Sequence, residues 1–324
     1  MISIFFKHGN SVSAGFINPG DPIPADTLWI DIFNPTLEEE RFIETQMQIQ
    51  IPSKEEVWKN EVLNRFYHED GVSYMTAALI TKIDSPYPQT SAVTFMLHEK
   101  YLVTMRYISP TSFQNFAQRF LRHPQKFTCG ASILEGLLEE IITRVAHNSE
   151  VVVQDLDALS HDIFGSSITE NSRNPSQIMQ AVIRRLGTCA DLNSKINESL
   201  YSLNRMLYYF MEVPSNSKEV KQDVYTLTTD VKALMRQTDF LADKVTFQLD
   251  ATLGMINVEQ NMIIKIFSVV AVFFLPPTMI SSIYGMNFKI MPELDWTMGY
   301  PMAIALMSMC ALIPFLYFRK KGWL

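Results

Sequence analysis

Apolar and polar residues alternate along the first third of the chain, which is the pattern of β-strands. The alternation is clearest in ISIFF, TLWIDI, VSYMTAALI, SAVTFML and YLVTMRY, all of which precede residue 108. Between these segments, residues 37–48 and 54–60 carry apolar residues at helical spacing. The pattern therefore predicts an α+β region, and we assign residues 1–125 to it.

Beyond Pro110 the apolar spacing becomes helical, with long stretches at residues 131–164, at 177–211 and from 216 onward. The breaks between them are GSSITENSRNPSQ and EVPSNS, which are rich in residues that end one helix and start the next. We expect a helical hairpin region over residues 126–215 and a stalk helix over 216–262.

Two apolar runs, residues 266–283 and 296–318, contain no charged residue and are long enough to cross a bilayer. We assign the spans to residues 263–284 and 296–318. Lys265 precedes the first run, and the tail 319–324 follows the second with three basic residues in succession. The positive-inside rule then puts the start of the first span and the end of the second span on the cytoplasmic side. The connection 285–295 would lie on the outer side.

The stalk helix has no proline or glycine cluster between residue 216 and the first span, and Gly254 is its single glycine. Helix can therefore continue from the stalk into the membrane for about 65 residues, or roughly 100 Å at 1.5 Å per residue. A helix of this length needs partners, so we expect it to pack against copies of itself or against the other long helices.

Stepping by alternate fours and threes along this helix from Asp250 selects one row, on which Gly254 comes next. Such a 3.5-residue spacing keeps one row facing one axis over many turns. The rest of the row is small or polar apart from two bulky members: Asn257, Asn261, Ile264, Ser268, Ala271, Leu275, Thr278 and Ser282. A polar row inside lipid faces either water or partner helices, so the row predicts either a wet pore or close helix packing.

Charge and motifs exclude other classes of function. The chain has 27 basic and 34 acidic residues, a formal net charge of −7, which does not suit a nucleic-acid partner. Three scattered cysteines form no CxxC pair, so neither a disulfide framework nor a zinc knot is indicated. The sequence has no Walker loop, GxSxG or HExxH motif, so we expect no enzyme.

The connection between the spans contains YGMNF at residues 284–288 and MPEL at 291–294, followed by Trp296 and GYP at 299–301. Together with the closing FRKKGWL, these motifs resemble the signature of the CorA magnesium transporter family. The match runs from about residue 255 to the end, and INVEQNMIIKIFSVV is close to the proteobacterial type.

The resemblance implies a homopentameric, funnel-shaped channel in the bacterial inner membrane, with both termini in the cytoplasm. The first spans would line the pore and the second spans would surround them. The ion implied is Mg²⁺, both transported and regulatory, with Co²⁺ and Ni²⁺ as further ions. Entry would be driven by the membrane potential.

In the family, GMN forms the outer mouth and recognises a largely hydrated ion, a role that falls here on Gly285, Met286 and Asn287. Magnesium loses its water reluctantly, and its bound waters are hydrogen-bond donors. The backbone carbonyl of Gly285 and the amide oxygen of Asn287 would supply the acceptors. A neutral ring of this kind would release a divalent ion that carboxylates would retain.

Further roles follow from the same resemblance. Two acids of the outer connection, Glu293 and Asp295, would concentrate cations near the mouth, whereas Lys289 would oppose them. Ile264 and Leu275 correspond to the apolar constrictions that the family is thought to use as a gate. Regulation would come from magnesium held between carboxylates of adjacent subunits, for which the candidates are Asp250, Asp223 and Asp230.

The sequence is also compatible with two other functions. One is a zinc transporter on the same scaffold, although the loops of those relatives generally lack MPEL. The other is a membrane-anchored coiled-coil scaffold or sensor, in which the polar row only packs helices. The second predicts that replacing Asn287 leaves ion flux unchanged.

Overall fold

The computed structural model describes residues 1–9, 11–53, 66–81, 88–165, 175–214, 216–287, 289, 291–292 and 295–323, with only the backbone of residues 175 and 176. The chain divides into two compact units, Met1–Leu249 and Asp250–Leu324. The helix expected at residues 54–60 lies outside the described residues.

The strands of the first unit form one seven-stranded sheet in the order β2-β1-β3-β7-β6-β5-β4. Their bounds are β1 (Ile2–His8), β2 (Ser11–Ile17), β3 (Thr27–Phe33), β4 (Phe66–Glu69), β5 (Val72–Thr81), β6 (Gln89–Leu97) and β7 (Leu102–Arg106). The central strands β3 and β7 pair in parallel, and the other neighbours pair antiparallel. The predicted α+β fold is confirmed, and β2 and β4 are two strands beyond those expected from the sequence.

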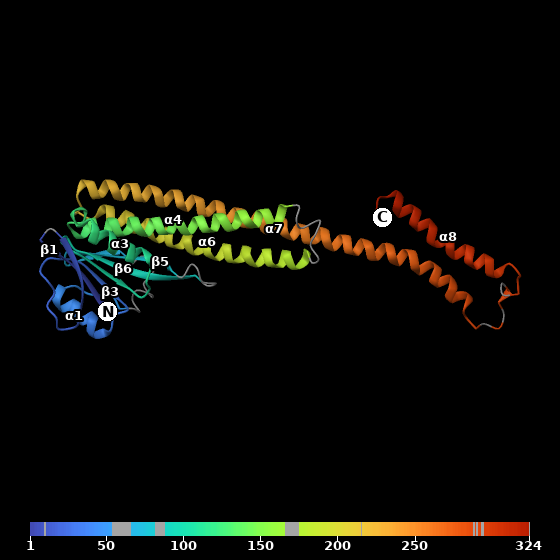
Figure 1. The fold of residues 1–324 in the computed structure, drawn as a ribbon, viewed down its shortest axis with the longest axis horizontal. Helices are drawn as coiled ribbons and strands as arrows, with labels where there is room; N and C mark the ends of the chain where they lie inside the picture. The colour runs from blue at the N-terminus through green and yellow to red at the C-terminus, as the bar shows by residue number, and fades with distance from the viewer. Residues whose placement is uncertain are drawn as a thin grey trace. The chain divides into compact units, whose positions relative to one another are not determined.

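One face of the sheet packs against α1 (Leu37–Met47), as Figure 1 shows. Thr36 caps this helix: its hydroxyl accepts from the amide of Glu39, and the Glu39 carboxylate accepts from the amide of Thr36. Ile43 is the buried residue of α1 and joins a core that includes Ile30 and Ile32 of β3. The helix predicted at residues 37–48 is thereby confirmed.

The other face packs against aromatic side chains of α3 (Thr111–Arg122). Phe116 and Phe120 are fully buried against Trp29 of β3. Beside them, Arg106 donates from both Nε and an NH2 group to the carboxylate of Asp31, at 2.8–3.2 Å. This buried ion pair joins the two parallel strands, and Arg106 also donates to the carbonyl oxygen of Ile108 at 2.6 Å.

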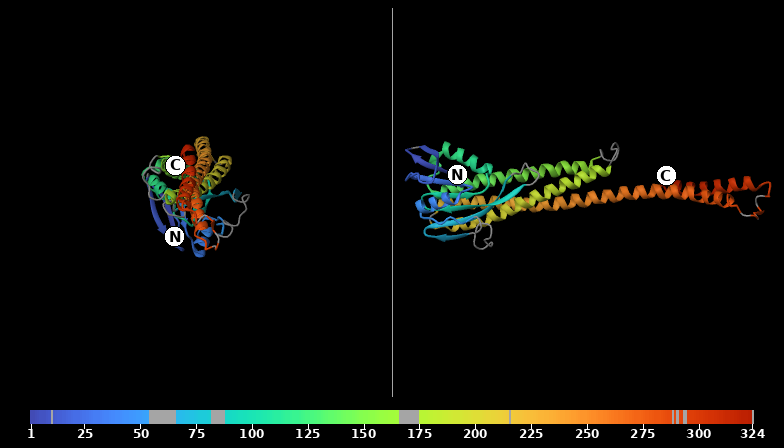
Figure 2. Two further views of the ribbon diagram at one scale, coloured as in Figure 1. Left: turned by 90° about the vertical axis from the view of Figure 1, so that its right-hand side faces the viewer. Right: turned by 90° about the horizontal axis from the view of Figure 1, so that it is seen from below.

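Two long helices, α4 (Gly130–Phe164) and α6 (Pro175–Glu212), run side by side in both views of Figure 2. Gly130 begins α4 directly against the backbone carbonyls of His98 and Tyr101, where a larger residue would clash. These two helices confirm the prediction for residues 131–164 and 177–211.

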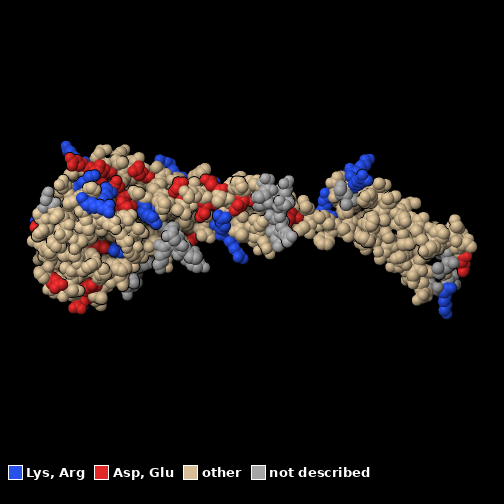
Figure 3. Space-filling model, viewed as in Figure 1, with Lys and Arg blue, Asp and Glu red and all other residues tan. Residues whose placement is uncertain are grey.

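The helix α7 (Lys218–Tyr284) is continuous for 67 residues, as expected from the absence of breakers. Its C-terminal part and α8 (Gly299–Lys320) are long and apolar enough to cross a membrane. In the most apolar stretch of α7 the share of buried residues is 0%, and in that of α8 it is 6%. The core helix of a soluble protein would instead be mostly buried. On the face that Figure 3 shows, few charged side chains of this unit lie between its two ends.

The second apolar helix begins three residues later than the predicted span. Residues 296–298 form a turn instead, in which the amide of Gly299 donates to the carbonyl of Trp296 at 2.9 Å. Pro301 lies in the first turn of α8, where the missing amide hydrogen costs no hydrogen bond.

Candidate functional site

The predicted polar row of α7 is exposed in the single chain over its whole apolar part. The exposed members are Asn257, Asn261, Ile264, Ser268, Ala271, Leu275, Thr278 and Ser282. Its two bulky residues are among them, with 61% of Ile264 and 66% of Leu275 accessible. A row that combines polar groups with exposure at membrane depth requires partner helices or water.

The opposite side of α7 faces α8. Val269 of α7 and Ala303 of α8 are each only 9% exposed. Nearby, Phe273 of α7 and the α8 residues Pro314 and Phe318 line an apolar gap of about 160 Å³. The row therefore points away from the helix that follows it in the chain, which leaves it free to face other copies.

The hydroxyl groups of the row are held in one orientation by the helix itself. Ser268 donates to the carbonyl of Ile264, Thr278 to that of Phe274 and Ser282 to that of Thr278, at 2.7–2.8 Å. Because each hydroxyl hydrogen is engaged, the exposed oxygen can act only as an acceptor. A column of such acceptors suits a cation, or a hydrated cation whose waters donate.

Gly285, Met286 and Asn287 follow directly on the last turn of α7. The amide of Gly285 donates to the carbonyl of Ser281 at 3.0 Å, and that of Met286 to the carbonyl of Ile283 at 3.3 Å. The C-terminal end of a helix carries partial negative charge, which favours a cation there. A Cβ at Gly285 would lie 3.2 Å from the Ser281 carbonyl oxygen and would crowd this turn.

The outer connection is only partly described. Lys289 and Asp295 are exposed, as their predicted roles near a mouth require, and Glu293 lies outside the described residues.

At the other end of the α7 and α8 pair, basic and aromatic side chains gather. Trp323 stacks on Phe318, with 5.3 Å between ring centroids. The ammonium groups of Lys265 and Lys321 lie 5.4 and 5.8 Å from the Trp323 ring. Tryptophan and lysine are typical of the membrane interface, and this cluster brings the basic flanks of both apolar helices to one side.

The three regulatory candidates lie at different positions along α7. Asp223 and Asp230 are exposed on α7 in the first unit, and Asp250 is exposed at the start of the second unit. No group of three metal-ligating side chains occurs among the described residues of this single chain.

Asp223 and Asp230 instead line a groove that the sequence did not predict. Glu135 and Glu139 of α4 form its other side, and its volume is about 570 Å³. Burial, together with the nearby carboxylates of Glu139 and Asp223, raises the pKa of Glu135 to about 7. Only the spacing of Glu135 and Glu139, one helical turn apart, could have hinted at this groove from the sequence.

The family model described as "CorA-like Mg2+ transporter protein" matches residues 24–320. A curated relative named Magnesium transport protein CorA, from Yersinia pseudotuberculosis serotype I (strain IP32953), is 32% identical over 327 residues, which cover 100% of both chains.

Solved structures agree with this fold. The complete structure of the CorA magnesium transporter from Methanocaldococcus jannaschii superimposes with a TM-score of 0.80 at 20% identity, over 100% of this chain and 99% of that one. The cytoplasmic domain of ZntB from Vibrio parahaemolyticus RIMD 2210633 matches with a TM-score of 0.60 at 10% identity, over 79% of this chain and 98% of that one.

Proposed function

Since the chain belongs to the CorA-like Mg²⁺ transporter family, we propose that it forms a homopentameric channel that admits Mg²⁺ across the bacterial inner membrane. The observation that carries this proposal is the exposed row of α7, whose back-bonded hydroxyls lead to Gly285 and Asn287. In a ring of five chains, the same oxygens would line one continuous path.

At the outer mouth, five copies of Gly285, Met286 and Asn287 bind the ion with its water shell. Carbonyl and amide oxygens accept hydrogen bonds from the bound waters, so the ion need not lose its shell. The negative ends of five α7 helices add attraction without a formal charge. Exposed Asp295, with Glu293, raises the local cation concentration, and Lys289 reduces it.

The membrane potential supplies the driving force. One elementary charge moving inward through 100 mV gains about 2.3 kcal/mol, so a divalent ion gains roughly 4.6 kcal/mol. Inward flow then needs no nucleotide hydrolysis. The basic cluster of Lys265, Lys321 and Trp323 lies at the start of the apolar part of α7 and at the end of α8. It supports an orientation in which these two ends, and both termini of the chain, face the cytoplasm.

Ile264 and Leu275 form the gate, because five exposed aliphatic side chains around a narrow axis exclude water and the ion with it. Cytosolic Mg²⁺ closes the channel through carboxylates of adjacent chains, with Asp250, Asp223 and Asp230 as candidates. All three carboxylates are exposed in the single chain, so a neighbouring chain can approach them.

The proposal also covers which other divalent ions the channel carries. Co²⁺ and Ni²⁺ have hydrated ions of similar charge and are expected to pass. A zinc transporter on the same scaffold is the alternative, because a fold does not by itself determine which ion is carried.

The test is uptake of Mg²⁺, Co²⁺, Ni²⁺ and Zn²⁺ into liposomes that contain the purified full chain. We expect Mg²⁺ entry that grows with an inside-negative potential and is unaffected by a proton gradient. Zinc entry that requires a proton gradient, with Mg²⁺ excluded, would favour the alternative. Absence of flux for every ion would contradict both and would leave the row of α7 as a packing surface.

A further inference from the structure

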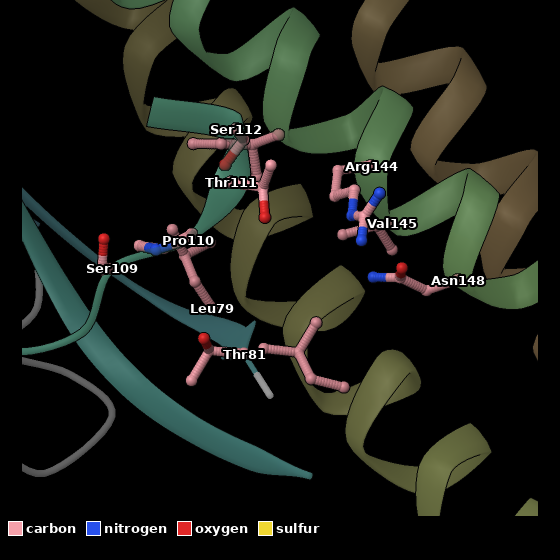
Figure 4. A pocket seen from close by; sticks show the side chains of 11 residues that line it. Leu79, Thr81, Ser109, Pro110, Thr111, Ser112, Arg144, Val145 and Asn148 are labelled. Carbon is pink, nitrogen blue, oxygen red and sulfur yellow. The ribbon is translucent and has the colours of Figure 1, made fainter. Parts of the chain in front are cut away.

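The first unit contains a second polar cavity, and none of its lining residues belongs to the proposed ion path. It has a volume of about 210 Å³ and is formed by the end of β5, by residues 109–112 at the start of α3, and by one face of α4. Figure 4 shows Arg144 and Asn148 of α4 directed towards the start of α3. These three parts are far apart in the sequence and come together only in the folded chain, so no sequence motif predicts the cavity.

The start of α3 offers unused donors to this cavity. Pro110 precedes the helix and provides no side-chain cap, so the amides of Thr111 and Ser112 have no acceptor within the helix. The segment before it is held in place, since Arg106 donates to the carbonyl of Ile108 and the amide of Phe113 donates to the carbonyl of Pro110. Positive partial charge at the start of a 12-residue helix therefore faces the cavity.

Asn148 gives independent evidence of a missing ligand. Its side chain is only 1% exposed and lines the cavity, yet its amide nitrogen has no hydrogen-bond partner. Leaving a buried donor unsatisfied is unfavourable, so Asn148 destabilises the fold as long as its amide nitrogen has no acceptor. An acceptor placed in the cavity would satisfy it.

Arg144 lies one helical turn before Asn148 and lines the same cavity. It forms no hydrogen bond or ion pair with any of the residues that the structure describes. The hydroxyls of Ser109, Thr111 and Ser112 add further hydrogen-bonding groups, and no carboxylate is among the described lining residues. The guanidinium of Arg144 and the amide nitrogen of Asn148 are thus two donors without a partner among the described residues.

We propose that this cavity binds a phosphate group. A guanidinium, a buried amide and the free amides at a helix start are the donors that phosphate oxygens require, and together they match its charge. A divalent cation does not suit the site, since Arg144 repels it and the amide hydrogens cannot coordinate it. The cavity has room for a tetrahedral anion, because its volume is many times that needed by one water molecule.

Binding of inorganic phosphate to the purified full chain, at constant ionic strength and low Mg²⁺, tests the proposal. We expect saturable binding that raises the unfolding temperature. Arg144→Gln and Asn148→Asp should each weaken binding at least about tenfold, because one loses the cation and the other introduces a repelling carboxylate. Arg122→Gln removes an exposed charge from the neighbouring helix α3 and should bind as the wild type does.

Asn148→Leu separates binding from folding. It removes an unsatisfied donor, so without phosphate its unfolding temperature should equal or exceed that of the wild type, while the gain from phosphate becomes smaller. Absence of saturable phosphate binding, or equal binding by all four variants and the wild type, would overturn the proposal. Because no ion flux is measured, the result is independent of transport.

The phosphate can be free or part of a nucleotide, and a parallel titration with a nucleoside triphosphate distinguishes these sources. Tighter binding of the nucleotide, lost in Arg144→Gln, assigns the cavity to a nucleotide phosphate. Equal or weaker binding assigns it to inorganic phosphate.

Discussion

The hydroxyl of Thr278 donates a 2.7 Å hydrogen bond to the carbonyl oxygen of Phe274, one turn earlier in α7. Its oxygen is therefore exposed as an acceptor, two turns before Gly285. Thr278→Val keeps the shape of the side chain and removes this acceptor. We expect a several-fold lower rate of Mg²⁺ uptake into liposomes, since one hydrogen bond contributes about 1 kcal/mol.

Thr278→Ser is the matched control, because serine can form the same bond and present the same oxygen. Its uptake should stay within about twofold of the wild type. Equal uptake by the valine variant would mean that the oxygens of the row do not contact the ion or its waters.

Leu275→Ser should make the channel leak. A polar side chain wets the constriction, so Mg²⁺ flux is expected to continue at internal Mg²⁺ concentrations that shut the wild type. Flux into liposomes preloaded with increasing Mg²⁺ measures this. Val270→Ser, on the side of α7 that faces α8, should still close. A Leu275→Ser channel that closes normally would remove Leu275 from the gate.

Lys289→Glu should lower the external Mg²⁺ concentration needed for half-maximal uptake by about two- to fivefold at low ionic strength. The exposed ammonium group repels cations at the mouth, and such surface effects are screened by salt. The shift should therefore shrink at about 0.5 M salt, where the Debye length is only a few ångströms. Lys289→Gln should give an intermediate value. An unchanged apparent affinity at low salt would end this explanation.

Glu135→Gln should stabilise the protein above neutral pH. Burial raises the pKa of Glu135 to about 7 in the folded chain, above the usual value near 4.3 that the unfolded chain retains. The folded state thus binds the proton more tightly, so the stability from this group is full below about pH 4 and is lost as pH rises through 7.

At pH 8 the glutamine variant should unfold a few degrees higher than the wild type, which corresponds to about 1–2 kcal/mol after allowance for solvent screening of a partly exposed group. Near pH 4.5 the two should unfold alike. Glu150→Gln, an exposed carboxyl on the same helix, should show no such difference. A pH-independent effect of Glu135→Gln would contradict the raised pKa.

Sequence pattern predicts this architecture where one physical signal dominates. The 67-residue helix α7 follows from the absence of breakers, and α1 from its spacing and the Thr36 cap. The pattern does not reveal β2, because SVSAGFI has two buried residues and no clear alternation, nor β4, because this edge strand buries little.

Two parts of the candidate site, the polar row and the GMN motif, can be predicted from the sequence because both lie on α7 or directly after its last turn. The acidic groove of Glu135 and Asp223 and the cavity of Arg144 and Asn148 were not, since each joins residues of different elements. The direction of a side chain cannot be predicted from the sequence. Only the structure shows that Thr278 and Ser282 donate their hydroxyl hydrogens within the helix and present their oxygens as acceptors.

The measurement that tests the central claim most directly is potential-driven Mg²⁺ uptake by liposomes containing wild type, Asn287→Ala or Thr297→Ala. Thr297 is an exposed polar residue of the same connection and serves as the control. If Asn287 supplies the acceptors that bind the hydrated ion, Asn287→Ala should lower the rate of Mg²⁺ uptake at least about tenfold, whereas Thr297→Ala should leave it almost unchanged. Equal uptake by all three proteins would contradict the proposed mouth and the function built on it.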